Sequence, residues 1–247
     1  MLEQLLKKID INKELLLKER PLNDFNLKQI KDYYRVGLTY SSNALEGNSI
    51  TLSETKVILE DGLTISGKPI KDFYETIGHA NAYDFMFSII NSININEEII
   101  KKLHYLFYNK IDNTNAGKYR KENVIITGSN YSVVDYKLIE KEIKEFEFWC
   151  QNERENYHPV VFSALVHKKM IFIHPFIDGN GRTARLLMNL ALLQKGYELA
   201  IIPPICRNEY IKYLELAHKN DKEFTQFIAE RVYETSKDMI RLFNISN

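Results

Sequence analysis

The sequence has no excess of charge and no long apolar run, and these two absences exclude whole classes of partner. Its 247 residues hold 33 basic and 33 acidic side chains, so nothing indicates the basic field that non-specific nucleic-acid binding requires. No apolar run approaches the roughly 18 residues that span a bilayer. We therefore expect neither a nucleic-acid partner nor a membrane-embedded protein.

Cysteine is also scarce. Cys150 and Cys206 lie far apart, without a CxxC pair or a nearby Cys/His cluster of the kind that binds zinc. We interpret both as ordinary thiols, which fits a cytoplasmic protein. The first 19 residues are interrupted by charges every few positions, unlike a secretory signal, so we expect a surface helix there and leave export as an effector open.

Most of the chain has apolar residues at three- and four-residue spacing, which indicates helices. Thr51 and Glu54 fit a capping box, and Asp61 with Gly62 fits the end of the same helix. No repeat or Pro/Gly-rich linker divides the chain, so the sequence predicts one all-α bundle. Its buried centre is expected at 157–173 and 181–195, which are apolar nearly all round. The other helices are expected at 1–19, 27–45, 52–60, 70–92, 96–108, 137–153, 208–218 and 222–244.

One stretch favours strand. Residues 124–136, VIITGSNYSVVDY, have two β-branched runs that flank a Gly-Ser-Asn turn. The sequence predicts a short β-hairpin there.

The segment HPFIDGNGRTAR, residues 174–185, lies between the two central helices. Pro175 cannot continue a helix, so His174 is expected at a helix end, facing a cavity. Gly179 and Gly181 permit backbone geometry that turns amide N–H groups inward as an anion nest, and the next helix adds the positive end of its dipole. The pattern indicates a site for a phosphate chain.

The polar side chains of this segment suit the same ligand. Arg182 and Arg185, three residues apart, are expected on one helical face, where each guanidinium grips phosphate oxygens. Asp178 offers a carboxylate suited to Mg²⁺, and Asn180 offers an amide donor. No GK[ST] follows the glycines, which excludes a P-loop, and Pro175 excludes an HExxH zinc helix.

HPFIDGNGRTAR matches the signature HPFx[DE]GNGRxxR, and residues from about 35 to 230 resemble the Fic-domain family. The resemblance implies a helical enzyme that transfers AMP from ATP to a hydroxyl of a target protein. It also implies an N-terminal helical extension at 1–34 and a Fic domain at 35–247, with an inhibitory helix, a flap and C-terminal helices.

Roles for the signature residues follow from the same resemblance. His174 is the implied base for a target Ser, Thr or Tyr, and Asp178 the implied holder of Mg²⁺. Asn180 and the loop amides of Gly179 and Gly181 are implied to bind the α-phosphate side. Arg182 and Arg185 are implied to bind the β- and γ-phosphates, and Tyr210 to close over the adenine.

Two further stretches resemble Fic elements. GKYRKENVIITGSNYSVVDY, residues 117–136, is similar to the flap that holds a target segment in extended form. SNALEG, from Ser42, is similar to the inhibitory motif [ST]xxxE[GN], with Ser42, Glu46 and Gly47 at the defined positions. The resemblance implies a class II Fic protein in which Glu46 takes Arg185 away from ATP. A homodimer and self-modification are further expectations.

Alternatives remain open from the sequence. An intact Glu46 fits an enzyme that removes AMP, or one that runs both reactions, because a carboxylate can position water. A catalytically quiet module that binds nucleotide and a partner fits a permanently inhibited site. In KDFYETIGHANAYDF, residues 71–85, Glu75 and His79 are expected to bond within the scaffold.

Overall fold

The computed structural model of the chain describes residues 1–18, 24–91 and 94–244. Helices make up the regular structure of this part, as the sequence predicted. The α-helices are α1 (Leu2–Lys18), α2 (Asp24–Ala44), α3 (Leu52–Lys56), α4 (Ile70–Ser88), α5 (Glu97–Tyr108), α6 (Ile139–Asn152), α7 (Pro159–Ile173), α8 (Asn180–Leu193), α9 (Arg207–Leu216) and α10 (Lys222–Leu242). A π-helical turn, Val57–Asp61, extends α3, and 3₁₀ turns lie at Tyr136–Leu138, Arg154–Asn156 and Pro204–Cys206.

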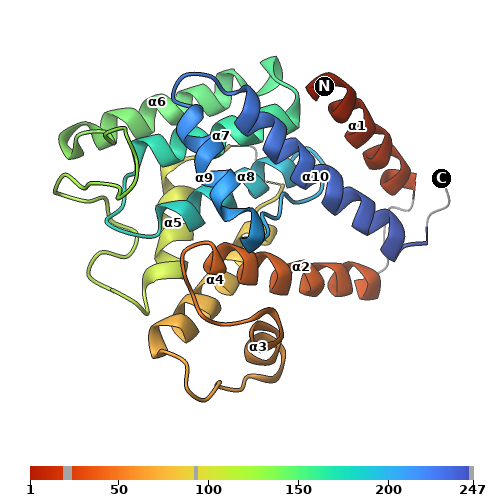
Figure 1. The fold of residues 1–247 in the computed structure, drawn as a ribbon, viewed down its shortest axis with the longest axis horizontal. Helices are drawn as coiled ribbons and strands as arrows, with labels where there is room; N and C mark the ends of the chain where they lie inside the picture. Colours follow the sequence, from red (N-terminus) through yellow and green to blue (C-terminus); the bar gives the residue numbers. More distant parts are fainter. Residues whose placement is uncertain (19–23, 92–93, 245–247) are drawn as a thin grey trace.

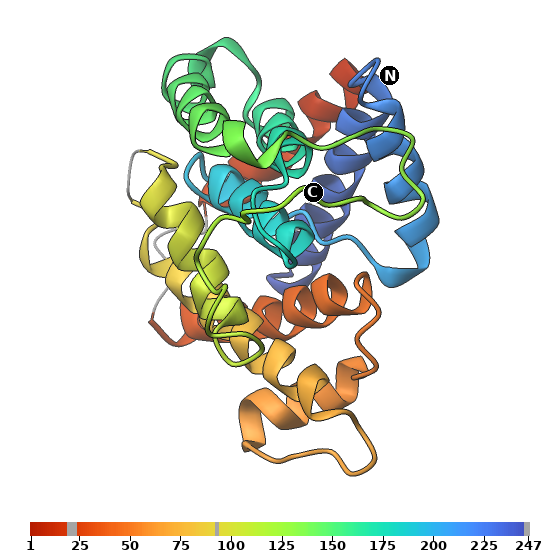
Figure 2. The same cartoon turned by 90° about the vertical axis from the view of Figure 1, so that its left-hand side faces the viewer.

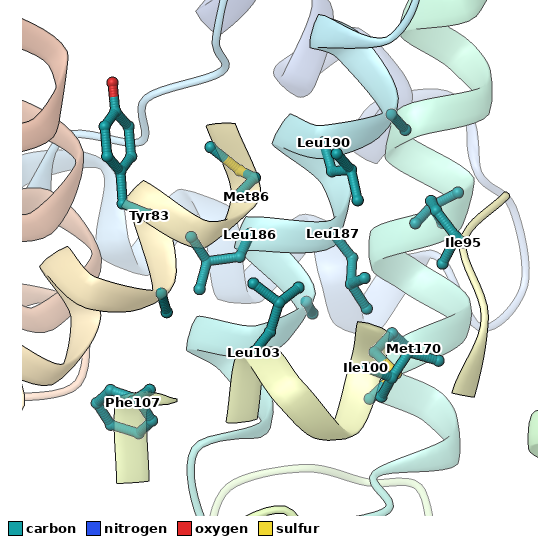
Figure 3. Packing of buried hydrophobic residues seen from close by; sticks show 14 of the residues in the cluster. Tyr83, Met86, Ile95, Ile100, Leu103, Phe107, Met170, Leu186, Leu187 and Leu190 are labelled. Carbon is teal, nitrogen blue, oxygen red and sulfur yellow. The ribbon is translucent and has the colours of Figure 1, made fainter. Parts of the chain in front are cut away.

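Helices α7 and α8 form the centre of the bundle (Figure 1). They pack along each other, α4 packs along α5, and α1 packs along α10. The main apolar core joins α4, α5, α7 and α8 through residues such as Met86, Leu103, Met170 and Leu187 (Figure 3). The prediction that the two central helices are buried on nearly all sides is confirmed, and the turn between them is therefore held by a rigid core.

Local signals in the sequence set the ends of the third helix. Thr51 and Glu54 form the predicted capping box: the Thr51 hydroxyl accepts from the Glu54 amide, and the Glu54 carboxylate accepts from the Thr51 amide at 2.8 Å. Gly62 follows the π-helical turn in the left-handed conformation, with φ of 68°. These contacts satisfy backbone groups that a helix end leaves unpaired.

The crossing of α4 and α5 depends on a glycine. A Cβ at Gly78 would lie 2.3 Å from the carbonyl oxygen of Phe107, which is backbone and cannot move aside. Gly78→Ala is therefore expected to lower the free energy of unfolding by about 1–3 kcal/mol or more, because the helices must separate. Urea unfolding would measure this change in the free energy of unfolding.

Gly37→Ala in α2 is the matched control. A Cβ there would lie 3.8 Å from its nearest neighbour, so the free energy of unfolding should stay or rise by up to about 1 kcal/mol. Equal stability of the two variants would show that α4 and α5 do not need this close approach.

The predicted hairpin at 124–136 needs correction, because the described residues contain no β-strand there (Figure 2). A turn forms at its tip, where the Ser129 amide donates to the Ile126 carbonyl. Side chains, not a ladder of backbone bonds, join the base of its two arms: Asn123 contacts the Asp135 carboxylate at 3.1 Å and accepts from the Tyr136 amide at 3.0 Å. We keep the name flap for residues 117–136.

The predicted division after residue 34 falls inside α2, which is continuous there, so this boundary stays a prediction. Within the described ranges, no helix is long and apolar enough to cross a membrane.

Candidate active site

The turn from α7 to α8 has an unusual backbone. His174 ends α7 with φ of 51°, a left-handed conformation that residues with a Cβ seldom adopt. Gly179 precedes α8 with φ of 79°, and a Cβ on it would lie 2.9 Å from the Phe107 ring. The glycine is required here for both its conformation and its lack of a side chain.

Asn180 keeps this turn in shape. Its side chain accepts from the Phe176 amide at 2.9 Å and donates to the Phe176 carbonyl at 2.8 Å. Both polar atoms of this side chain are bonded and the residue is 2% exposed, so the binding of a phosphate by the Asn180 side chain stays a prediction. The backbone at this helix start keeps free donors, because the amides of Asn180, Gly181 and Arg182 have no hydrogen-bond acceptor within the described chain.

His104 of α5 is a second support that the sequence did not reveal. Its Nδ1 accepts from the Gly117 amide at 2.9 Å, so Nε2 carries the proton and donates to the Asp178 carbonyl at 3.0 Å. Its ring stacks on Phe176 at 3.7 Å. A histidine within an amphipathic stripe gives no sequence signal for such a role.

The Arg182 side chain packs against α4 and α5. Its guanidinium is 3% exposed and lies 4.1 Å from the centre of the Phe107 ring, with NH1 2.9 Å from the Glu75 carboxylate. NH2 lies 3.7 Å from the Asp178 carboxylate, and the binding of phosphates by Arg182 stays a prediction. Glu75 and His79 bond within the scaffold as predicted, since His79 Nδ1 lies 3.1 Å from the Thr39 hydroxyl.

Arg185 faces the opposite way, toward the end of α2. NH2 lies 2.6 Å from the Glu46 carboxylate and 2.9 Å from the Ser42 carbonyl, and Nε donates to the Ser42 hydroxyl at 2.9 Å. Gly47, with φ of 91°, turns the chain away just after Glu46. The structure thus brings together Ser42, Glu46 and Arg185, as the inhibitory motif predicts.

The Glu46 carboxylate also touches the first turn of α8. A Cβ at Gly181 would lie 2.3 Å from Glu46 Oε1, so any larger residue there would force the carboxylate to move. Burial alone would raise the pKa of Glu46, but Arg185, with Arg182 and Arg207, holds it below its usual value. The carboxylate is therefore an anion at the positive end of a helix. About a third of its side chain, 35%, stays open to water.

Tyr210 lies beneath Arg185. Its hydroxyl accepts from Arg185 NH1 at 3.4 Å and shares a hydrogen bond with His167 Nε2 at 2.9 Å, and the residue is 5% exposed. Tyr210 also lines the cavity described next, so its closing over an adenine stays a prediction. Arg207, one turn earlier, donates to the Leu45 carbonyl at 2.8 Å and so holds the end of α2.

These groups surround one cavity of about 520 Å³, within the range of small-ligand sites. It is lined by His174, Gly181 and Arg185, by Glu46 after α2, and by residues 126–129 and 131–133 of the flap. Asp178 is exposed outside this lining. Its Oδ1 accepts from the Gly179 amide at 2.6 Å, and its Oδ2 has no hydrogen-bond partner in the described residues.

The flap tip is fixed to α9 and the residues after it. The Asn130 amide donates to the Glu215 carboxylate at 3.2 Å. The ring of His218 stacks between Tyr131 and Phe172, with 3.7 Å between ring centres on each side. The flap is thus held at both its base and its tip.

His174 is suited to accept a proton. Burial lowers its pKa to about 4, against an opposing effect of the Ile171 carbonyl. The imidazole is therefore neutral at about pH 7, with one nitrogen able to act as a base. It lies in the same cavity as Arg185, which supplies positive charge.

Three other buried histidines are neutral for the same reason, and they predict acid sensitivity. Burial lowers the pKa of His79 and His167 to about 3 and that of His104 to about 4. Each binds a proton in the unfolded chain near pH 6.5 but not in the folded one. Stability should therefore fall as pH drops from about 6.5 toward 4, by up to about 1.4 kcal/mol per pH unit for each histidine.

Urea unfolding at several pH values would measure this slope. His79→Gln is the matched variant, since it removes one such group, and its slope should be shallower. A free energy of unfolding that stays constant between about pH 7 and pH 5 would contradict the prediction.

The fold and the site define an all-α protein whose two central helices frame a cavity lined by a histidine and an arginine. Residues 94–192 match the Fic/DOC family model. Over 200 residues, 79% of this chain, the sequence is 38% identical to protein adenylyltransferase Fic of Drosophila yakuba, and it is 36% identical to the protein of the same name from Drosophila melanogaster. The chain spans 40% of the length of each of these relatives.

A solved structure, Fic-1 from C. elegans, superposes with a TM-score of 0.87 at 27% identity, covering 100% of this chain and 74% of that one. A Fic domain containing signaling protein from Bacteroides thetaiotaomicron shares the fold, with a TM-score of 0.83, 24% identity and coverage of 100% and 97%. The chain belongs to the Fic/DOC family.

Proposed function

We propose that the chain is a protein adenylyltransferase that transfers AMP from ATP to a Ser, Thr or Tyr hydroxyl of a target protein. The observation that carries the proposal is that one cavity is lined by a neutral His174, by Gly181 at the start of α8 and by Arg185. The named relatives, protein adenylyltransferases, support it.

In the proposed reaction, His174 takes the proton of the target hydroxyl as its oxygen attacks the α-phosphorus. The bond from that phosphorus to the bridging oxygen breaks, and pyrophosphate leaves. The amides of Asn180, Gly181 and Arg182 stabilise negative charge near the α-phosphate, and Arg185 binds the far phosphates. Positioning and charge stabilisation provide most of the remaining acceleration.

A magnesium ion fits this arrangement through one protein ligand. Asp178 has an unpaired carboxylate oxygen beside the turn, and no cluster of three His, Cys, Asp or Glu side chains suited to a metal occurs in the described residues. Mg²⁺ commonly binds one carboxylate together with substrate phosphates. When bound, it would neutralise phosphate charge.

We infer that Glu46 inhibits the enzyme. Its carboxylate occupies the Arg185 guanidinium and the start of α8, where phosphates of ATP would bind. ATP must displace this anion or bind with misplaced phosphates. The lowered pKa of Glu46 supports a brake that stays charged near neutral pH.

The flap is the proposed target-binding element. The amides of Val124, Ile125, Ile126 and Thr127 have no acceptor among the described residues, so an extended target segment can pair with this arm. Self-modification and a homodimer remain proposals. So does a cytoplasmic location, which the two free thiols support.

One alternative reaction has specific support. Glu46 is partly open to water in the cavity that His174 lines, so it is placed to position a water for removal of AMP. Incubating wild-type and Glu46→Gly protein with labelled ATP, Mg²⁺ and candidate targets separates the functions. Label on protein supports transfer, and loss of AMP from a modified protein supports removal. ATP binding without either reaction supports a quiet nucleotide-binding module and contradicts the transferase.

A further inference from the structure

One buried guanidinium outside the cavity joins the two halves of the site. Arg120, 5% exposed, donates from Nε to the His174 carbonyl at 2.8 Å, and its own amide donates to the Pro175 carbonyl at 2.9 Å. NH1 donates to the Glu122 carbonyl at 2.8 Å, and NH2 donates to the Val134 carbonyl. One side chain therefore bonds the turn after α7 and both arms of the flap.

The turn needs such support. His174 has a left-handed backbone, and its own amide remains bonded to the Met170 carbonyl at 3.1 Å. The ring contributes little restraint, because the buried Nδ1 makes no hydrogen bond of normal geometry within the described residues. The direction of the imidazole therefore depends on the backbone conformation of His174, and Arg120 bonds the carbonyl of that residue.

Arg120 acts through geometry more than through an ion pair. Within the described residues it forms no salt bridge, and its donors are matched by peptide carbonyls. Burial lowers its pKa, with the Asp135 carboxylate opposing, yet an arginine stays charged. The three nitrogens of the guanidinium each bond a different carbonyl, whereas the three N–H donors of a lysine ammonium all start from one nitrogen and cannot reach carbonyls spread around the fork.

We propose that Arg120 is a positioning residue for the transfer reaction, which holds the turn that presents His174 and fixes the flap to the same point. The base and the target-binding loop then keep a constant spacing. The inference rests on the proposed function for the identity of the reaction, whereas the effect of Arg120 on the His174 turn is measurable without it.

The kinetic test uses the Glu46→Gly protein, so that the proposed brake does not mask the effect. Adding Arg120→Met should lower the turnover number for AMP transfer about a hundredfold, because a small misplacement of a reacting group is enough. The dissociation constant for ATP should change by less than about threefold, since Arg120 lies outside the cavity. Lys144→Met changes an exposed side chain of α6 outside the flap and the cavity, so it is the control and should leave the turnover number unchanged.

Arg120→Lys covers the case in which the methionine variant does not fold, because it keeps the charge and the apolar stem. It should also lose most of the turnover number, since one ammonium cannot replace the fork. A turnover number within about threefold of the parent in either folded variant would overturn the inference.

NMR provides a readout that does not need catalysis. The imidazole resonances of His174, assigned by their loss in His174→Ala, should shift in Arg120→Lys, whereas those of His79 on α4 should stay. The charged groups that act on His174 are Arg120, Asp178 and Glu46, and only the first is changed. If Glu46→Gly transfers no AMP, the proposed function fails, and unmoved His174 resonances would separately refute the role of Arg120.

Discussion

Glu46→Gly is expected to increase AMP incorporation by at least about tenfold, which corresponds to about 1.4 kcal/mol of activation free energy. The reason is the 2.6 Å contact between the carboxylate and Arg185. Stranding one partner of a buried pair costs about 3–5 kcal/mol, but Glu46 is 35% exposed and ATP replaces it on Arg185, so the barrier is smaller. Intact mass after incubation with ATP and Mg²⁺ would measure self-modification, and labelled ATP would measure transfer.

Ser42→Ala is the internal comparison for this experiment. It removes one hydrogen bond to Arg185 and leaves the Glu46 carboxylate in place, so activity should rise much less. Equal activity of wild-type and Glu46→Gly protein would refute the brake and leave the transferase proposal standing.

His174→Ala in the Glu46→Gly protein should lower transfer by about 10²–10⁴, the range that a general base contributes. ATP binding should remain, because the amides of α8 and Arg185 are unchanged. Isothermal titration with a non-hydrolysable ATP analogue and a transfer assay would measure the two quantities. As the pH is lowered, the Glu46→Gly protein should keep His174 unprotonated until the pH approaches about 4, since burial lowers the pKa of His174 to about that value.

His158→Asn is the matched control. It removes an imidazole that caps α7 outside the cavity, and asparagine is itself a good capping residue. Transfer should stay within about twofold of the parent. Retention of transfer in the His174→Ala protein would show that another group accepts the proton.

The sequence predicted the helices well because their signals are local. Apolar spacing marked every α-helix, and Thr51 with Glu54 marked a start. The turn at 174–185 was also predictable, since proline and glycine restrict or free the backbone regardless of neighbours.

The contacts that the sequence did not reveal depend on neighbours far away in sequence. Arg182 and Arg185 are three apart, but α8 is buried on all sides, so each reaches a different helix. Glu75 on α4 pairs with Arg182, and Glu46 after α2 pairs with Arg185. The β-branched residues of the flap favour strand, but Asn123 and Arg120 bond its arms through side chains, and no ladder forms.

The fixation of the flap at two points has a consequence for target recognition. Arg120 anchors its base, and Asn130 with the Tyr131 ring anchors its tip. A segment that docks on this loop meets a surface whose conformational entropy was already lost during folding. If the flap binds the target as proposed, association carries a smaller ordering penalty, and weak side-chain preferences of the target suffice for binding.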